Sequence, residues 1–201
     1  MLNLIRRIYR RFKQLSFWLR RQHLFKALSY SVGFVSPFRI DGSDGIAIKE
    51  RTFFQSNLWL YCIGLDGIKA NLTIGHGCVF GYNNHITCVR EVTIGDFVLT
   101  ANNVYISDNL HSYEDISKPI IKQEVQFKRA VSIGCGSWIG ENVSIIGATI
   151  GKNSVIGANS VVTRDIPDYS VAVGAPATVI RQYDFELQRW VDKKQPFKSI
   201  F

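Results

Sequence analysis

Four histidines supply the side chains of this sequence that can exchange a proton near neutral pH, and their neighbours distinguish them. His23 lies in a strongly basic segment and is most simply a solvated residue, while His76 occupies a polar surface position. His111 follows Asp108 and Asn109, a polar environment that can fix one tautomer and leave the other ring nitrogen free. We therefore expect His111 to act as a general base, with an incidental role in a solvated loop as the alternative.

The His and Cys pattern does not predict a metal site. Zinc needs ligands that converge on one point. The histidines His76, His85 and His111 fall at different positions of a six-residue repeat, which separates them. The four cysteines contain no Cys-x-x-Cys pair and match no zinc ribbon or disulfide framework, which favours a reducing compartment. Those inside the repeat are expected to be small buried residues in place of Val or Ala: Cys78, Cys88 and Cys135.

The six-residue repeat, which typically begins with Ile-Gly, runs through most of the chain. Its hexads start at Ile74, Phe80, Ile86, Ile94, Thr100, Ile106, Ile133, Ile139, Ile145, Ile150, Ile156 and Val162. A short fixed period is the signature of a solenoid, in which each hexad supplies one short strand and an inward aliphatic residue. Three hexads make one triangular coil. The repeat therefore predicts an all-β parallel β-helix over residues 36–178, with an irregular first coil before Asp66.

Two segments leave this period. Residues 107–130 carry charges and Pro119, so we expect them to project from the solenoid as a loop, and long loops inside a regular repeat usually serve function. Residues 179–201 form a C-terminal tail, in which Phe185–Val191 is expected to be a short helix that closes the end of the solenoid.

The net positive charge of the chain is concentrated in its N-terminal arm, residues 1–35, and in the few residues that follow it. Residues 1–40 contain nine basic side chains and no acidic one, which leaves fifteen basic against sixteen acidic residues elsewhere. The charge is thus no sign of nucleic-acid binding by the main domain. Residues 2–28 read as an amphipathic helix, whose apolar stripe fits either an anionic membrane surface or packing on the protein itself or a sister subunit.

No apolar stretch is long enough to span a bilayer, and arginines interrupt the N-terminal apolar residues, so no signal peptide is recognised. We expect a cytoplasmic protein, with peripheral contact between residues 1–30 and the inner membrane face as an open alternative.

A resemblance to a known family covers about residues 70–182. The stretch VTIGDFVLTANNVYISDNLHSYED, followed by VSIGCGSWIG and IGKNSVIGANSVVTRDIPDYSVAVGAPATVIR, closely resembles hexapeptide-repeat acetyltransferases of the galactoside, nodulation-factor and surface-polysaccharide type. The resemblance implies a left-handed β-helix, a homotrimer with active sites between adjacent subunits, and acetyl-CoA as the acyl donor.

The same resemblance implies roles for particular residues. His111 falls on the catalytic histidine, which takes the proton from an acceptor hydroxyl while that oxygen attacks the thioester directly. The backbone N–H that binds the oxyanion maps to Glu141, where the family often has Ser or Ala. The positions that would contact CoA are Trp138, Gly140, Glu141, Ala158, Thr163, Arg164 and Arg181. Ordinary packing is the alternative for Trp138 and Ala158.

The sequence departs from the family pattern in places that bear on the substrate. Asn109 replaces the first histidine of a Ser-Asp-His-x-His motif, and the coil after Glu141 is one residue short. The candidates for contacts with the acceptor hydroxyl are Asn83, Asn84 and His85, with a solvated surface as the alternative.

The leading functional hypothesis is an acetyl-CoA-dependent O-acetyltransferase that acts on a sugar hydroxyl of a surface polysaccharide, O-antigen or glycolipid precursor. A soluble antibiotic or small-sugar acetyltransferase on the same scaffold is the second hypothesis. A non-catalytic trimeric scaffold is the third.

Overall fold

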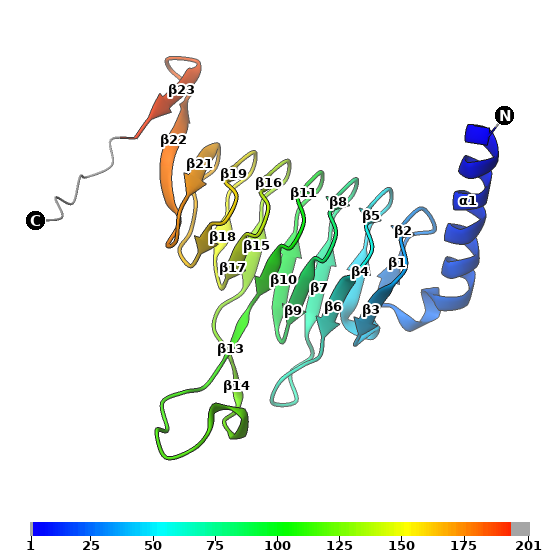
Figure 1. Ribbon diagram of the computed structural model, residues 1–201, viewed down its shortest axis with the longest axis horizontal. Coiled ribbons are helices and arrows are strands. Elements are labelled where there is room, and N and C mark those ends of the chain that lie inside the picture. The colour runs from blue at the N-terminus through cyan, green and yellow to red at the C-terminus, as the bar shows by residue number, and fades with distance from the viewer. Residues whose placement is uncertain (1, 194–201) are drawn as a thin grey trace, which may run out of the picture.

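The computed structural model describes residues 2–193 of the chain (Figure 1). Short parallel strands wind into a triangular prism with three faces, which we call faces A, B and C in the order in which each coil visits them. Face A consists of β1 Ala27–Leu28, β4 Ile46–Ile48, β7 Asn71–Ile74, β10 Glu91–Ile94, β15 Val131–Ile133 and β18 Thr149–Ile150.

Face B begins with β2 Gly33–Phe34, β5 Phe53–Phe54, β8 Val79–Phe80, β11 Leu99–Thr100, β16 Trp138–Ile139, β19 Val155–Ile156 and β21 Ser170–Val173. Face C consists of β3 Phe38–Asp41, β6 Leu58–Cys62, β9 His85–Cys88, β12 Tyr105–Ser107, β17 Ser144–Ile146 and β20 Val161–Val162. A coil therefore runs from face A to face B to face C and returns to face A.

The predicted inward positions form the core. All twelve residues at the predicted hexad starts, from Ile74 to Val162, are at most 2% exposed. Because neighbouring coils stack in register, residues at the same position of successive coils lie above one another, as Leu72, Val92 and Val131 do on face A. The apolar ladder thus follows from the repeat, and the predicted solenoid is confirmed.

The core is bulky at its N-terminal end and narrow at its C-terminal end. Along face B, the rings of Phe34, Phe54 and Phe80 stack with centroids 5.0 and 4.6 Å apart. At the equivalent position near the other end lies Ala172, which is fully buried. Stacked aromatic rings contribute somewhat more than their buried area alone.

The solenoid starts earlier than the sequence suggested. The helix α1 spans Leu2–Arg21 and is followed by η1 Gln22–Leu24, so the predicted helix to residue 28 is too long. The first coil begins at β1, not at residue 36, because Phe25 and Leu28 pack against the core and the Trp18 indole donates a hydrogen bond to the Leu28 carbonyl at 2.7 Å. Neither helix of this segment is long and apolar enough to cross a membrane.

The predicted closing helix at Phe185–Val191 is wrong. The chain turns back after β21 and forms the antiparallel strands β22 Thr178–Asp184 and β23 Arg189–Asp192 (Figure 1). The Asp184 carboxylate accepts hydrogen bonds from the backbone N–H groups of Glu186 and Leu187, both at 2.9 Å, and so stabilises the connecting turn. Tyr183 and Trp190 pair across the two strands, which favours the hairpin over a helix.

The predicted projecting loop leaves the prism at the corner where face C passes to face A (Figure 1). Its base is an antiparallel hairpin of β13 Asn109–His111 and β14 Val125–Phe127, and it contains the short helix η3 Ile120–Lys122. The two remaining short helices are η1 and η2 Ser43–Gly45. The hairpin thus extends His111 beyond the surface of the coils.

Candidate functional site

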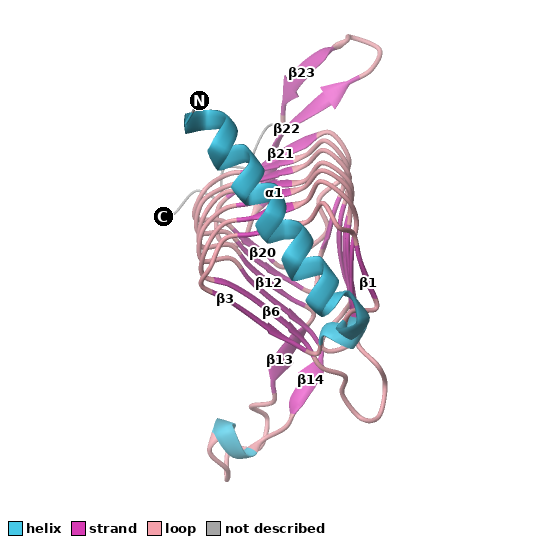
Figure 2. Ribbon diagram, turned by 90° about the vertical axis from the view of Figure 1, so that its right-hand side faces the viewer, coloured by secondary structure: helices cyan, strands magenta, loops and turns pink. Residues whose placement is uncertain are grey.

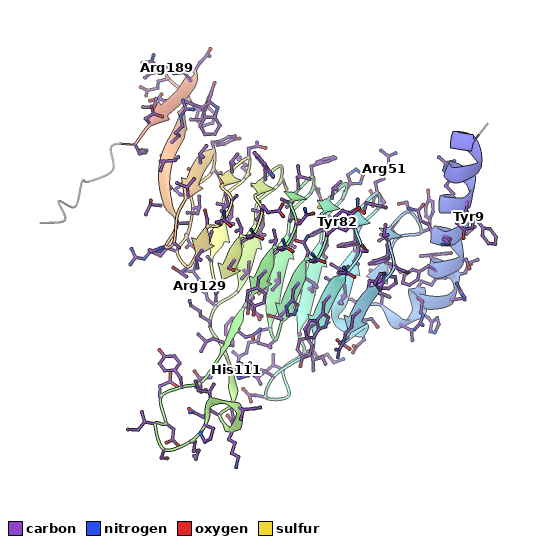
Figure 3. The ribbon with its side chains drawn as sticks, in the orientation of Figure 1. Tyr9, Arg51, Tyr82, His111, Arg129 and Arg189 are labelled. Atoms are coloured by element: carbon purple, nitrogen blue, oxygen red, sulfur yellow. The ribbon has the colours of Figure 1, made fainter. Side chains whose placement is uncertain are left out.

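His111 is the last residue of β13 and is paired with Val125 of β14 on the projecting hairpin (Figure 3). Its side chain is exposed. Because side chains alternate along a strand, His111 points to the same side of the hairpin as Asn109, whose amide donates hydrogen bonds to Thr87 at 3.2 Å and Asp108 at 2.9 Å. The histidine is therefore held on a regular strand pair and is accessible to another molecule.

Asp108 fixes the point at which the hairpin leaves the coil. Its carboxylate is fully buried and accepts hydrogen bonds from the backbone N–H groups of Val89, Arg90 and Glu91, the shortest at 2.8 Å. This corner is where the repeat gains two residues between Ile86 and Ile94. The Asp108 carboxylate thus binds the preceding coil, a role that the sequence did not predict because these partners lie 17 to 19 residues earlier in the chain.

The other side of the hairpin is anchored further along the solenoid. The Asp108 carbonyl accepts a hydrogen bond from the Lys128 N–H at 2.8 Å. Arg129 pairs with Asp165 and donates to the Gly147 carbonyl at 2.9 Å. The Thr149 N–H, with help from Arg129, lowers the pKa of the Asp165 carboxyl from its ordinary value. Both ends of the His111 hairpin are therefore tied to the coils.

Four of the predicted CoA contacts gather on face B and at the corner where it passes to face C. Trp138 is 49% exposed and lies in an outward row between Leu99 and Val155. Two residues later comes Gly140, where an added Cβ would lie 2.8 Å from the backbone nitrogen of Ala158. The turns of successive coils are therefore in close contact here, and the exposed Ala158 leaves the space outside them open.

The backbone N–H of Glu141 lacks the hydrogen bond that the equivalent N–H groups of the two preceding coils donate. The Tyr82 N–H donates to the Asn102 side chain at 2.8 Å, and the Asn102 N–H donates to the Glu141 carboxylate at 3.4 Å. The next residue in this series is Ala158, which has no acceptor side chain. Within residues 2–193, no acceptor is found for the Glu141 N–H, which is therefore free to bind an oxyanion.

The Glu141 side chain has a structural role. Its carboxylate accepts hydrogen bonds from the amides of Asn102, at 3.2 Å, and Asn103, at 3.4 Å. Asn103 also belongs to a ladder of asparagines with positive φ, which are hydrogen-bonded from coil to coil: Asn57, Asn83, Asn103, Asn142 and Asn159.

The three remaining predicted CoA contacts lie elsewhere. Thr163 and the exposed Arg164 follow β20 at the corner between faces C and A, beside Asp165, which anchors the projecting hairpin. Arg181 lies on β22, where its guanidinium pairs with Asp192 at 2.7 Å. Arg181 would have to exchange this exposed partner for a phosphate in order to contact CoA.

Within one chain, His111 does not lie beside the four predicted CoA contacts Trp138, Gly140, Glu141 and Ala158. In a triangular prism, each face lies opposite one corner. His111 extends from the corner between faces C and A, whereas Trp138 lies on face B, which is the opposite side (Figures 1 and 3). A site that uses both groups must therefore form between two copies of the chain.

The candidate acceptor residues lie on and beside the corner between faces B and C. Asn84 is fully buried, and its amide donates to the carbonyl of Gly81 at 2.8 Å, so the expectation that it contacts an acceptor is wrong. The exposed Asn83 belongs to the asparagine ladder. His85 stacks on Trp59 with ring centroids 4.2 Å apart and a 2° angle, and burial lowers the pKa of its imidazole.

The cysteines differ in exposure, and the described residues hold no metal-binding cluster. Cys78 and Cys88 are buried as expected, but Cys135 is exposed at a turn, where its sulfur accepts a hydrogen bond from the Asp96 N–H. Across residues 2–193, no three His, Cys, Asp or Glu side chains are grouped in a way that could hold a metal ion.

Both the sequence and the structure of this chain match known proteins. Residues 130–164 match the family model described as bacterial transferase hexapeptide (six repeats). The structure is similar to an N-acyltransferase from Bacillus cereus, solved in complex with dTDP and 3-hydroxybutyryl-CoA, with a TM-score of 0.70, 16% identity, and coverage of 84% of this chain and 89% of that one. The expected fold, a left-handed parallel β-helix, is confirmed.

Three curated proteins are similar in sequence. A galactoside O-acetyltransferase of Escherichia coli K12 is 34% identical over 158 residues, which are 78% of this chain and 76% of the relative. A putative lipopolysaccharide biosynthesis O-acetyl transferase of the same strain is 37% identical over 58% of this chain and 66% of its own length. A probable acetyltransferase of Mycobacterium tuberculosis is 40% identical over 67% of this chain, but the match spans only 46% of that relative.

Proposed function

The chain belongs to the hexapeptide-repeat acetyltransferases, and on this basis we propose that it transfers an acetyl group from acetyl-CoA to a sugar hydroxyl. The acceptor in this proposal is a surface polysaccharide, O-antigen or glycolipid precursor, handled at the cytoplasmic side of the membrane. The names of the galactoside and lipopolysaccharide relatives support this class of acceptor.

The observation that carries the proposal is where His111 and the Glu141 N–H lie on the prism. His111 is exposed and the Glu141 N–H has no acceptor among residues 2–193, yet the two groups lie at different edges of one prism. Closed rings of identical subunits bring different edges of neighbouring copies together. We therefore propose a homotrimer, in which His111 of one subunit faces the Trp138 and Glu141 region of the next.

In the proposed reaction, the acceptor hydroxyl lies between His111 and the acetyl thioester. The imidazole takes the hydroxyl proton as the oxygen attacks the carbonyl carbon, and the Glu141 N–H donates to the oxygen that becomes negative. When the tetrahedral intermediate collapses, the carbon–sulfur bond breaks and CoA leaves as a thiol with the proton held by His111. The products are an O-acetyl ester and free CoA.

The CoA arm is proposed to lie along the turns of successive coils beside Gly140 and Ala158. A larger side chain at Ala158 would block this path, and Trp138 offers an exposed ring for the pantetheine chain. Thr163 and the guanidinium groups of Arg164 and Arg181 are proposed to meet the polar and phosphate end of CoA. Asn83 and His85 remain the proposed acceptor contacts.

The test uses mixed oligomers of two inactive variants. We expect His111→Ala to lower kcat by about 10²–10⁴-fold, the usual contribution of a general base. Ala158→Trp is expected to abolish acetyl-CoA binding. When both chains are mixed, unfolded and refolded together, roughly a quarter of the interfaces in a random ring contain an intact His111 and an intact Ala158 side. Activity should therefore return to about that fraction.

His23→Ala is the matched control, because His23 is also an exposed histidine but lies far along the chain in η1. It should leave kcat unchanged. A single-chain site would give no recovery in the mixture. Full activity of His111→Ala with a suitable acceptor would instead indicate a non-catalytic scaffold.

The acceptor is tested in the cell that makes the protein. Mass spectrometry of the surface glycan after removal of the gene should show the loss of one acetyl group for each repeat unit. An unchanged glycan would favour the second hypothesis, a soluble antibiotic or small-sugar acetyltransferase on the same scaffold.

A further inference from the structure

The helix α1 has one face against the solenoid and another turned away from it. Phe17 packs on Phe34 and Phe38 of the first coil, with ring centroids 5.1 and 5.7 Å apart, and Trp18 donates a hydrogen bond to the Leu28 carbonyl. This side of the helix covers the N-terminal end of the hydrophobic core (Figure 2). Packing on the protein itself therefore accounts for part of the apolar stripe.

Three other apolar residues of α1 face outward. Phe12, Leu15 and Leu19 are 68%, 45% and 59% exposed. At 100° per residue, these three side chains share an arc on the side of the helix away from Phe17. Three large apolar side chains aligned on one helix face are more than the scattered exposed residues of an ordinary surface.

Basic side chains border this exposed stripe. Arg11, Lys13 and Arg20 are exposed on either side of it, Arg21 is exposed nearer the Phe17 side of the helix, and no acidic residue precedes Asp41 in the sequence. A second copy of this chain would bring the same positive charges against one another. An anionic surface complements them, because cations beside a half-buried apolar stripe are the arrangement with which interfacial helices bind acidic lipids.

A cleft at the C-terminal end of α1 adds a place for a headgroup. It has a volume of about 420 Å³ and lies between the helix and the first coil, with the two arginines Arg20 and Arg21 at its rim. Its apolar lining includes Phe17, Phe25 and Phe38. A cleft with two guanidinium groups and an aromatic floor suits a phosphate that is attached to an apolar chain.

We propose that α1 is a docking surface for an anionic lipid bilayer, in which Phe12, Leu15 and Leu19 enter the interface and the basic residues contact lipid phosphates. The helix crosses the end of the prism, so docking through it leaves faces A, B and C free (Figure 2). The N-terminal end of the solenoid would thus contact the membrane. His111 and Glu141 would remain accessible to a glycan.

Point variants of the full chain test this proposal better than a deletion of residues 1–30, which would remove β1 and uncover the core. The probe is flotation with phosphatidylcholine vesicles that contain or lack phosphatidylglycerol. Arg20→Gln with Arg21→Gln should weaken binding on the order of 30-fold, since each basic residue near an acidic surface contributes about 1 kcal/mol. Phe12→Ser with Leu19→Ser should cause a loss of similar order.

The matched controls lie on the projecting loop. Ile116→Ser with Ile121→Ser removes two apolar side chains that are 99% and 89% exposed, and Lys118→Gln with Lys122→Gln removes two charges. Both controls should bind vesicles like the unchanged chain. Binding of the unchanged chain should also fall as salt is raised, because salt screens exposed charges.

Two kinds of result would overturn the proposal, one in the vesicle assay and one in the molar mass. One is equal binding of the helix variants and the unchanged chain, or binding that does not depend on phosphatidylglycerol. The other is a change in molar mass of the Phe12 and Leu19 variant without a change in vesicle binding, which would make this stripe an interface between copies. Acetyl transfer to a soluble acceptor is measured separately, so failure of membrane docking and failure of the proposed catalysis are distinguishable.

Discussion

Asp108→Asn is the substitution that most directly tests how the His111 hairpin is held. The change keeps the size of the side chain but removes its charge and replaces one acceptor oxygen with an NH₂ group. In the native chain, the two carboxylate oxygens accept from three consecutive backbone N–H groups and from the Asn109 amide. One orientation of the new amide opposes the backbone donors, and the other opposes the Asn109 NH₂ group.

The magnitude follows from these contacts. A hydrogen bond to a charged group contributes about 1.5–3 kcal/mol, against about 0.5–1.5 kcal/mol for a neutral one. Loss of charge at three backbone donors therefore costs about 3 kcal/mol, which is partly offset because a buried charge no longer has to be desolvated. We expect the free energy of unfolding to fall by about 2–3 kcal/mol, and Tm by roughly 4–12 °C.

Urea unfolding gives the free energy, and hydrogen exchange gives its location. The amides of Val89, Arg90 and Glu91 should lose protection in Asp108→Asn, whereas the Gly134 amide, which donates to the Ile150 carbonyl, should keep it. Asp115→Asn, on the exposed part of the loop, is the control and should cost well under about 1 kcal/mol. Unchanged protection at the three amides, or a loss of stability no larger than the control's, would refute the reasoning.

Two further predictions concern the core and face C. Phe80→Ala removes the ring that stacks on Phe54 at 4.6 Å and should cost about 3–5 kcal/mol in the same urea assay, so a cost below that of Asp115→Asn would argue against a tightly packed aromatic core. Burial lowers the pKa of His85, so protonation opposes folding: stability is lost as pH falls from the unfolded pKa of about 6.5 toward the lower folded value. His85→Gln should remove this part of the acid sensitivity, and parallel pH profiles for both chains would contradict the assignment.

The repeat predicted the scaffold well because its information is local. Each hexad carries an inward residue of the same kind, and the small residue after it meets the backbone of the next coil, as Gly140 meets Ala158. The predictions were wrong at both ends of the solenoid, because contacts between residues of different repeats or strands determine the structure there. Residues 27–34 have no clear Ile-Gly signal, yet they form a coil because Phe34 stacks on Phe54, and Phe185–Val191 lies in a hairpin because of cross-strand partners.

The candidate site was only partly predictable for a different reason. The sequence motifs indicated His111, Trp138 and Glu141 one by one. The free N–H of Glu141 depends on which side chain the next coil places beside it, and the burial of Asn84 depends on contacts with the turn that follows. Such relations join residues about 16–39 positions apart, so no single hexad reveals them.

The stacking of the coils continues across the projecting loop without a shift. Thr93 before the loop pairs with Ser132 after it, just as it pairs with Thr73 on its other side. The register of the coils therefore does not depend on residues 112–124, which lie beyond the anchored hairpin, and the entropy of closing such a loop grows only slowly with its length, by about 0.6 kcal/mol for each doubling. Evolution can thus lengthen, shorten or exchange this outer part of the loop at little cost to the scaffold, and an engineer who grafts a relative's segment between His111 and Val125 has the same freedom.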